Sequence, residues 1–284
     1  MGDLKVIQTV SDMHRTADEM RASGLRIGLV PTMGYLHGGH LSLIRQARRA
    51  SDRVVVSIFV NPMQFGPQED YATYPSDFER DVKLIQGMGG DLVYAPSAKE
   101  MYPEGYATYV AVERLTQHLC GPTRPRHFRG VTTVVTKLFA AVKPHVAVLG
   151  QKDAQQAVVV RQMVRDLDLD VEIRVAPTVR EADGLARSSR NVYLSPGERR
   201  EAPVLYQALQ EARSLVAQGE RRAAVVVEAM RQRIAARPHA RIDYVCVVNA
   251  EDLRPVEALS GAVLFALAVR FGKARLIDNF QVSL

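Results

Sequence analysis

Residues 25–60 decide the fold class and read LRIGLVPTMGYLHGGHLSLIRQARRASDRVVVSIFV. A short apolar run over residues 25–30 ends at Pro31, and residues 40–50 then place Leu41, Ile44 and Ala47 at helical spacing. Residues 54–60 form a continuous β-branched and aromatic run, which is typical of a strand covered on both faces. A strand, a helix and a second buried strand in this order indicate a parallel sheet.

The same alternation continues through the first half of the chain. Ser76 and Glu79 have the spacing of a capping box, and the helix that follows is expected to stop at Gly89 and Gly90. Further strands are predicted at 91–94, 146–149 and 171–175, with helices at 131–142 and 154–166. These elements predict an α/β fold, a Rossmann-like doubly wound parallel sheet with helices on both faces.

The pattern changes after Tyr193. Ser195, Pro196 and Glu198 stand in the order that begins a long helix, and a second helix is predicted over 223–236. Strands are predicted at 242–248, 263–269 and 274–280. We therefore expect two domains, residues 1–177 and a second, smaller α+β C-terminal domain over residues 178–284, joined in the polar stretch 177–191.

Composition narrows the class of protein. The 284 residues are 47% hydrophobic and 24% charged, which is typical of a globular chain with a sizeable core. The net charge of +6 attracts polyanions, but the charges are spread along the chain, 6% of residues are aromatic and none is Trp. These features argue against nucleic acid as the partner, and a basic pocket for a nucleoside triphosphate accounts for part of the charge.

Compartment and membrane association follow from the absence of certain patterns. Cys120 and Cys246 match no metal or redox spacing, which suggests a reducing compartment. The N-terminus does not read as a secretion leader, and the most apolar stretch, 262–269, is too short to span a bilayer. We expect a cytoplasmic protein without a membrane anchor.

The loop over residues 31–40, PTMGYLHGGH, lies between the first predicted strand and its helix. Ligands of such sheets bind beyond the carboxyl ends of the strands, and a helix N-terminus favours phosphate. His37 and His40 are three residues apart, so they share one face of the first turn and can donate N–H groups to phosphate oxygens. The alternatives are two surface histidines in a Gly-rich turn, or a zinc site that lacks a third ligand.

Polar side chains also follow other predicted strands. Asn61 and Gln64 follow the second strand, and their amides suit a hydroxylated acid that carries no cation, although a polar turn reads similarly. In residues 150–156, GQKDAQQ, Lys152 can place an ammonium on phosphate. Asp153 can cap the helix or meet a ribose hydroxyl or magnesium.

Two loops are rich in cations. Residues 177–191, PTVREADGLARSSRN, hold two adjacent hydroxyls followed by an arginine, a set that can close over a triphosphate, although a solvated linker would have a similar composition. Residues 124–130, RPRHFRG, could receive pyrophosphate or form a solvated basic loop.

The histidine loop, read as Pro-Thr-Met-Gly-x-Leu-His-x-Gly-His, resembles the pantothenate synthetase family, part of the nucleotidyltransferase superfamily with a His-x-x-His motif. Segments 57–65, 124–130, 150–156 and 177–191 agree with that family, so the resemblance covers essentially the whole chain. It implies an ATP-dependent, AMP-forming ligase that condenses pantoate with β-alanine to give pantothenate through a pantoyl-adenylate. It also implies a homodimer whose first domain binds nucleotide and pantoate and whose second domain closes over the ATP site.

The resemblance assigns roles to particular positions. His37, His40 and Lys152 are expected to be catalytic, and Asp81 is the one acid carried over for Mg²⁺. Pantoate and β-alanine are expected at Asn61, Gln64 and Gln156. ATP is expected at Met33, Gly34, His37, His40, Gly150, Gln151, Lys152, Asp153, Val179, Arg187, Ser188, Ser189 and Arg190.

Four positions depart from the family pattern: Gly38, Gln151, Ala154 and Arg187. Arg187 replaces an apolar residue, and its long cation could strengthen ATP binding or distort the loop. Two other functions stay open from the sequence. One is another nucleotidylyltransferase of the superfamily acting on a phosphorylated acceptor, although the amides at Asn61, Gln64 and Gln156 argue against a phosphate there. The other is a noncatalytic RNA-binding relative, which would show salt-sensitive retention on RNA.

Overall fold

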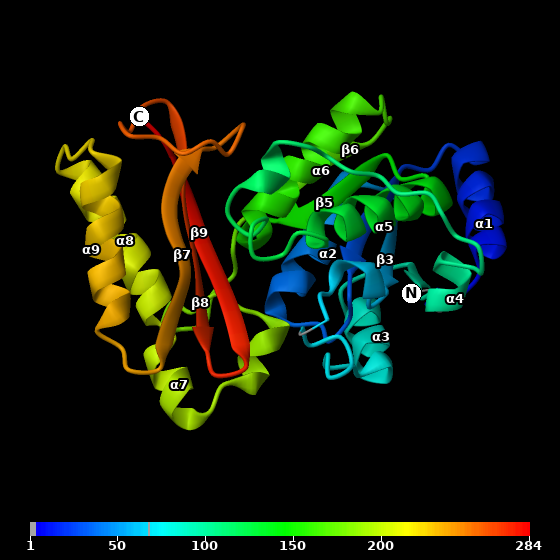
Figure 1. The fold of residues 1–284 in the computed structure, drawn as a ribbon. Coiled ribbons are helices and arrows are strands. Elements are labelled where there is room, and N and C mark those ends of the chain that lie inside the picture. The colour runs from blue at the N-terminus through cyan, green and yellow to red at the C-terminus, as the bar shows by residue number, and fades with distance from the viewer. Residues whose placement is uncertain (1–3, 68) are drawn as a thin grey trace. The chain divides into compact units, whose positions relative to one another are not determined.

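A six-stranded parallel sheet organises the first part of the chain in the computed structural model, which describes residues 4–67 and 69–284 (Figure 1). Its strand order is β1-β4-β3-β2-β5-β6. Every neighbouring pair is parallel. The strands are β1 (Lys5–Ile7), β2 (Ile27–Thr32), β3 (Arg53–Ile58), β4 (Leu92–Tyr94), β5 (Val146–Gly150) and β6 (Glu172–Ala176).

Helices cover both faces of this sheet. Helix α2 contacts α3, and α1 contacts α5. The connections through α2 and α3 run one way along the sheet and those through α1 and α5 run the other way, so right-handed crossovers place the two pairs on opposite faces. These helices are α1 (Val10–Ala22), α2 (Gly38–Ala50), α3 (Phe78–Gly87), α4 (Ala98–Met101), α5 (His127–Val142) and α6 (Ala154–Asp166).

Two compact units divide the chain. The first comprises residues 1–113, 123–150 and 159–177, and the second comprises 114–122, 151–158 and 178–284. The short 3₁₀ helices η1 (Pro62–Gln64), η2 (Leu115–Gln117), η3 (Gln151–Asp153) and η4 (Ser189–Tyr193) lie in loops that carry many of the predicted site residues.

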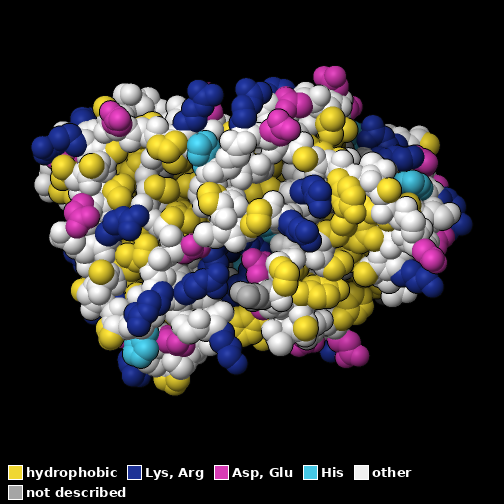
Figure 2. Space-filling view, viewed as in Figure 1, with side chains coloured by type: hydrophobic (Ala, Val, Ile, Leu, Met, Phe, Trp, Pro, Cys, Tyr) yellow, Lys and Arg dark blue, Asp and Glu magenta, His cyan; other side chains and the backbone are white. Residues whose placement is uncertain are grey.

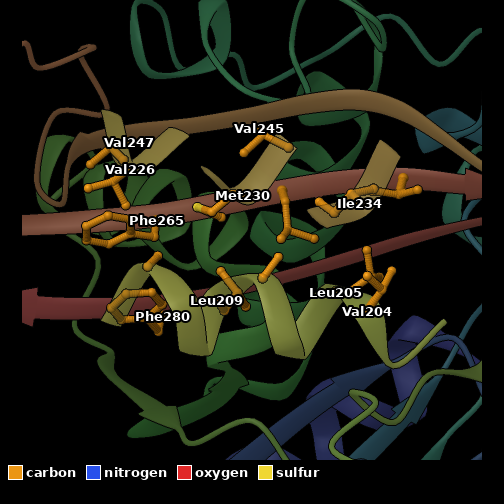
Figure 3. Packing of buried hydrophobic residues seen from close by; sticks show 14 of the residues in the cluster. Val204, Leu205, Leu209, Val226, Met230, Ile234, Val245, Val247, Phe265 and Phe280 are labelled. Carbon is orange, nitrogen blue, oxygen red and sulfur yellow. The ribbon is translucent and has the colours of Figure 1, made fainter. Parts of the chain in front are cut away.

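The second unit is an antiparallel sheet covered by two helices. Strands β7 (Ala240–Asn249), β8 (Ala262–Phe271) and β9 (Ala274–Ser283) pair in sequence order. Helices α8 (Val204–Ala217) and α9 (Ala223–Ala235) pack on them, and Figure 3 shows Leu209 and Met230 pointing into the same core as strand residues. Phe265 and Phe280 stack there with ring centroids 4.5 Å apart. The predicted α/β sheet with a smaller α+β unit is therefore confirmed.

Three local predictions were wrong or incomplete. The long helix expected from Ser195 is interrupted, because α7 (Pro196–Glu201) ends before Pro203 and α8 follows it. Pro203 has no N–H to continue the helical hydrogen bonds. The N-cap of α3 is Asp77, whose side chain accepts from the Arg80 N–H, and not Ser76. Strand β1 and helix α1 were not predicted from the sequence.

Surface composition matches an ordinary charged exterior. On the face drawn in Figure 2, Lys and Arg side chains are interspersed with Asp and Glu. Within residues 4–67 and 69–284, no helix is both long enough and apolar enough to cross a membrane.

Candidate functional site

The loop that carries the histidines begins at the end of β2 and is tied to β3. The Thr32 hydroxyl donates to the Ser57 carbonyl at 2.7 Å and accepts from the Gly34 N–H at 3.1 Å. Gly34 has a φ of +83°, and a Cβ there would lie 3.2 Å from Asp81 Oδ2. Glycine therefore fits this turn both in conformation and in space.

Asp81 holds the next two residues of this loop. Its two carboxylate oxygens accept from the N–H groups of Tyr35 at 2.6 Å and Leu36 at 2.7 Å. The side chain is 1% exposed, and burial raises its pKa although these hydrogen bonds oppose the rise. Asp81, which the resemblance offered for Mg²⁺, thus supports the histidine loop. Among the described residues there is no group of three or more His, Cys, Asp or Glu side chains that could hold a metal ion.

His37 and His40 form a reciprocal cap at the start of α2. His37 is the N-cap, and its Nδ1 accepts from the Gly39 N–H at 3.1 Å. His40 Nδ1 accepts from the His37 N–H at 3.3 Å, and the two ring centroids are 4.1 Å apart. A backbone N–H can only donate, so each neutral ring carries its proton on Nε2. Two Nε2–H donors therefore belong to one helix N-terminus.

Gly39 makes room for this cap. A Cβ at Gly39 would lie 2.8 Å from His37 Cε1 and 2.9 Å from His37 Nδ1. Contacts this short are not tolerated, so any larger residue would push the His37 ring away from the first turn of α2. Of the two glycines in the motif, Gly39 is therefore the one that the position of the His37 ring requires.

The amides after β3 form a second ordered group. Asn61 is 1% exposed, and its Nδ2 donates to the Gly130 carbonyl at 3.0 Å and to Gln64 Oε1 at 3.1 Å. Its Oδ1 accepts from the Met63 N–H at 3.3 Å. Gln64 Nε2 in turn lies 3.3 Å from Met33 Sδ, so three predicted site residues are brought together. Both the amide nitrogen and the amide oxygen of Asn61 are therefore hydrogen-bonded, and Asn61 holds Gln64 in place.

Part of the basic loop at the start of α5 is held by hydrogen bonds, whereas Arg126 and Arg129 are exposed. Arg124 forms a two-pronged ion pair with Glu69, with distances of 2.6 and 2.7 Å, and His127 Nδ1 lies 2.9 Å from the Gln64 carbonyl. Burial alone would raise the pKa of Glu69, but the hydrogen bonds and charge of Arg124 bring it below its ordinary value. These contacts fix the segment that carries Gln64.

Lys152 lies in η3, which the second unit's sheet holds. Asn279 on β9 donates from Nδ2 to the carbonyls of Gln151 and Lys152, both at 2.9 Å, and its Oδ1 accepts from Gln151 Nε2 at 3.0 Å. The Lys152 ammonium lies 3.5 Å from the Asp153 carboxylate. The departure at Gln151 is thus accommodated by a direct amide pair.

The predicted ATP loop over 177–191 is anchored to the same strand. Arg180 pairs with the Asp278 carboxylate at 2.6 and 3.0 Å, and Asp278 is 2% exposed. Burial raises the pKa of Asp278, and the charge and hydrogen bonds of Arg180 oppose this rise. The solvated-linker alternative is therefore wrong for this part of the loop.

Arg187 and the hydroxyls follow this anchor. The Arg187 guanidinium lies 3.0 Å from the Glu181 carboxylate. The backbone N–H of Arg187 donates to the Val179 carbonyl at 2.9 Å. An acid of the same loop therefore offsets the unusual cation. The Ser188 hydroxyl accepts from the Arg190 N–H at 3.3 Å and caps η4, which orders the Ser188–Arg190 turn.

The remaining predicted positions lie at element ends. Gly150 is the last residue of β5, and Ser189, which is buried, begins η4. Gln156 lies on α6 and is half-buried. The first unit thus holds the histidine loop and the Gln64 group, and the second unit holds Lys152, Gln156 and residues 179–190.

Sequence reasoning missed Asp278, Asn279 and Tyr102. Asp278 and Asn279 are adjacent polar residues that interrupt the apolar residues Leu276, Ile277 and Phe280 of β9, which is a signal that could have singled them out. Tyr102 donates its hydroxyl to Asn61 Oδ1 at 2.8 Å. Nothing in the sequence near Tyr102 indicates that partner, which lies 41 positions away.

Known proteins resemble this chain over its whole length. The pantothenate synthetase of Moorella thermoacetica is 58% identical over 276 residues, 97% of this chain and 98% of the relative. The crystal structure of pantothenate synthetase from Thermus thermophilus matches with a TM-score of 0.93 and 49% identity, covering 99% of this chain and 100% of that one. The pantoate-beta-alanine ligase from Francisella tularensis, complexed with beta-gamma ATP and beta-alanine, matches with a TM-score of 0.79 and 32% identity, covering 98% and 97%. The sequence profile of the pantoate-beta-alanine ligase family matches residues 5–281, and the chain belongs to this family of ligases.

Proposed function

We propose that this enzyme condenses pantoate with β-alanine and converts ATP to AMP and pyrophosphate. The names of the relatives support these substrates, as does the Francisella tularensis ligase, complexed with beta-gamma ATP and beta-alanine. In the first step, a pantoate carboxylate oxygen forms a bond to the α-phosphorus, and the bond from that phosphorus to pyrophosphate breaks. In the second, the neutral amine of β-alanine attacks the acyl carbon, AMP leaves, and the nitrogen loses a proton.

The observation that carries this proposal is the pair of backbone hydrogen bonds that the two histidine rings accept. His37 and His40 each accept a backbone N–H at Nδ1, which leaves Nε2–H as the donor of each ring. Donors fixed in this way need no reorganisation when charge develops on phosphate oxygens. We assign His40 to the α-phosphate and His37 to neighbouring oxygens, with the N-terminus of α2 and the adjacent Met33 and Gly34 completing this side of the ATP site.

The second unit supplies the cations for the triphosphate. Asn279 binds the backbone carbonyls of Gln151 and of Lys152 itself, so the ammonium is presented from an ordered backbone. Ser188 and Arg190 share the capped turn of η4, and a guanidinium is suited to two phosphate oxygens at once. Residues 150–153, the Val179 backbone, Arg187 and Ser189 make up the rest of the proposed ATP site.

Mg²⁺ belongs to this proposal as part of the nucleotide substrate. The described residues contain no cluster of acids or histidines able to hold the ion, and Asp81 is occupied by backbone N–H groups. The ion would enter bound to ATP oxygens, and no step here depends on a protein ligand to it.

The acid is recognised by amides. Gln64 and Gln156 are proposed to bind pantoate and β-alanine, and Asn61 acts by holding Gln64. An uncharged donor suits a hydroxylated acid, whereas a phosphorylated acceptor would need cations at these positions. We also propose that residues 178–284 move to close over ATP, that the enzyme is a homodimer, and that it acts in the cytoplasm.

Exchange of labelled pyrophosphate into ATP, dependent on pantoate and without β-alanine, tests the reaction. The enzyme should catalyse this exchange, and His40→Ala and Lys152→Ala should reduce it on the order of a hundredfold while remaining folded. His14→Ala and Lys83→Ala serve as matched controls on α1 and α3. Exchange that does not need pantoate, or that survives in both site variants, would refute the proposed reaction or these roles.

A further inference from the structure

We infer that Tyr102 is a positioning residue that fixes which end of the Gln64 amide faces the acid substrate. Tyr102 follows α4, and its hydroxyl lies 2.8 Å from Asn61 Oδ1. Asn61 in turn pairs with Gln64. The inference rests on the proposed function, in which Gln64 binds pantoate.

Tyr102, Asn61 and Gln64 form a hydrogen-bonded relay, and backbone groups settle the direction of every hydrogen bond in it. The Gly130 carbonyl can only accept, so the Asn61 atom 3.0 Å from it is Nδ2. The Met63 N–H can only donate, so the atom 3.3 Å from it is Oδ1. The Tyr102 hydroxyl faces this same oxygen and therefore donates its proton to it. Asn61 cannot be flipped without breaking these contacts.

The orientation of Gln64 follows from that of Asn61. Asn61 Nδ2 donates its second N–H to Gln64 Oε1 at 3.1 Å, so this oxygen faces Asn61. Gln64 Nε2 is then turned to the other side, where it lies 3.3 Å from Met33 Sδ in the histidine loop. A ligand on that side meets an N–H donor, so the relay favours an oxygen acceptor such as a carboxylate or a hydroxyl.

Tyr102 is held independently of its hydroxyl. Its ring lies 6.2 Å from that of Phe59 and 5.1 Å from that of Tyr106, centroid to centroid, and the Lys137 ammonium lies 6.0 Å from its centroid. Burial, and to a lesser extent Tyr106, raises the pKa of the Tyr102 phenol, so it remains a donor at neutral pH. Replacing Tyr102 by Phe keeps the ring contacts and removes only the donor.

The first experiment compares Tyr102→Phe with Tyr109→Phe, a matched variant at a tyrosine that is 42% exposed. Loss of one buried hydrogen bond in the relay should raise the KM for pantoate roughly tenfold in Tyr102→Phe. The kcat and the KM for ATP should stay within about twofold, and Tyr109→Phe should resemble the unaltered enzyme. Equal losses for both substrates together with a lower Tm would mark a structural role and overturn the inference.

A double-variant cycle separates this inference from the proposed function. If Tyr102 acts through Gln64, adding Tyr102→Phe to Gln64→Ala should cause no further loss of pantoate affinity. If the two effects multiply, or if Gln64→Ala is impaired and Tyr102→Phe is not, the relay is wrong while the acid site stands. If Gln64→Ala binds pantoate normally, the proposed acid site is wrong and the relay falls with it.

Gln64→Glu tests the presented donor itself. The carboxylate would still accept from Asn61, but it would place an acceptor and a negative charge where the N–H now stands. Pantoate affinity should therefore fall further in Gln64→Glu than in Gln64→Ala. An equal or smaller loss would show that the outward group of Gln64 is not a donor to the acid.

Discussion

Gly39→Ala should separate activity from stability, because the glycine makes room for the His37 ring, which we propose to be catalytic. A methyl group at this position would lie 2.8 Å from His37 Cε1 and 2.9 Å from Nδ1. The ring would have to turn away, and its hydrogen bond from the residue 39 N–H would break. His37 would then no longer present Nε2–H from the first turn of α2.

Two contributions of Gly39→Ala to the free energy of unfolding have opposite signs. Alanine is favoured over glycine in a helix by up to about 1 kcal/mol. Loss of the His37 cap costs about 1 kcal/mol, so the free energy of unfolding should change by no more than ~1 kcal/mol. The variant should lose the transition-state donor that we propose for His37, which should lower the rate on the order of a hundredfold.

Two measurements check this prediction. Initial rates of pantoate-dependent pyrophosphate–ATP exchange report adenylation, and urea unfolding reports stability. Gly87→Ala is the matched control, because a Cβ at this helical glycine would meet nothing within 4 Å. It should keep normal exchange. His37→Ala should lose about as much exchange as Gly39→Ala, and the two together should lose little more.

Near-normal exchange by Gly39→Ala would refute the reasoning, because the His37 ring cannot keep its present place beside a methyl group. A loss of more than about 3 kcal/mol in unfolding free energy would also contradict it. In that case the clash would act on the fold and not on the histidine.

Two further changes act on the supports of the site. Glu69→Gln should lower the free energy of unfolding by about 1–2 kcal/mol at pH 7, because a charge-assisted pair with Arg124 is lost. The pKa of Glu69 in the folded protein is below its ordinary value of 4.5, so this contribution is full above pH 4.5 and fades as the pH falls through the folded pKa. Urea unfolding at several pH values should show the two proteins converging in acid, and a constant difference would contradict the assignment. Asn279→Asp replaces two donors to carbonyl oxygens with an acceptor and should raise the KM for ATP about tenfold or more. Gln281→Glu, an exposed change on the same strand, should leave this KM unchanged. Equal KM values for the two variants would contradict the role given to Asn279.

The architecture was predictable where apolar runs were long and continuous. The run over residues 54–60 predicts β3, and the helix predicted at 154–166 has the bounds of α6. Helix α1 was missed although it buries Met13, Thr16, Ala17 and Met20 at helical spacing. Two of these four are small or polar, so the apolar periodicity is faint. Strand β1 has three residues, and such a short run carries little pattern.

Some residues of the candidate site could be predicted from the sequence, and the residues that hold them in place could not. His37, His40 and Lys152 stand beside their strands and helices in the sequence, so local reasoning could single them out. Their supports come from distant positions, because a hydrogen bond needs only nearness in space. Asp81 reaches back 46 positions to the Tyr35 N–H, and Asn279 reaches 127 positions to the Lys152 carbonyl. No local spacing rule detects such pairs.

The buried acids show that these supports serve geometry more than stability. Burial raises the pKa of both Asp81 and Asp278 above the ordinary value of 3.8. The folded state therefore loses stability as the pH rises from 3.8 through each folded pKa, because the ionised carboxylate carries a desolvation cost in the interior. Well-packed apolar residues would avoid that cost, but they could not accept the Tyr35 and Leu36 N–H groups or pair with Arg180. The chain keeps these acids in its interior at the two places where they hold the histidine loop and the loop proposed to bind ATP.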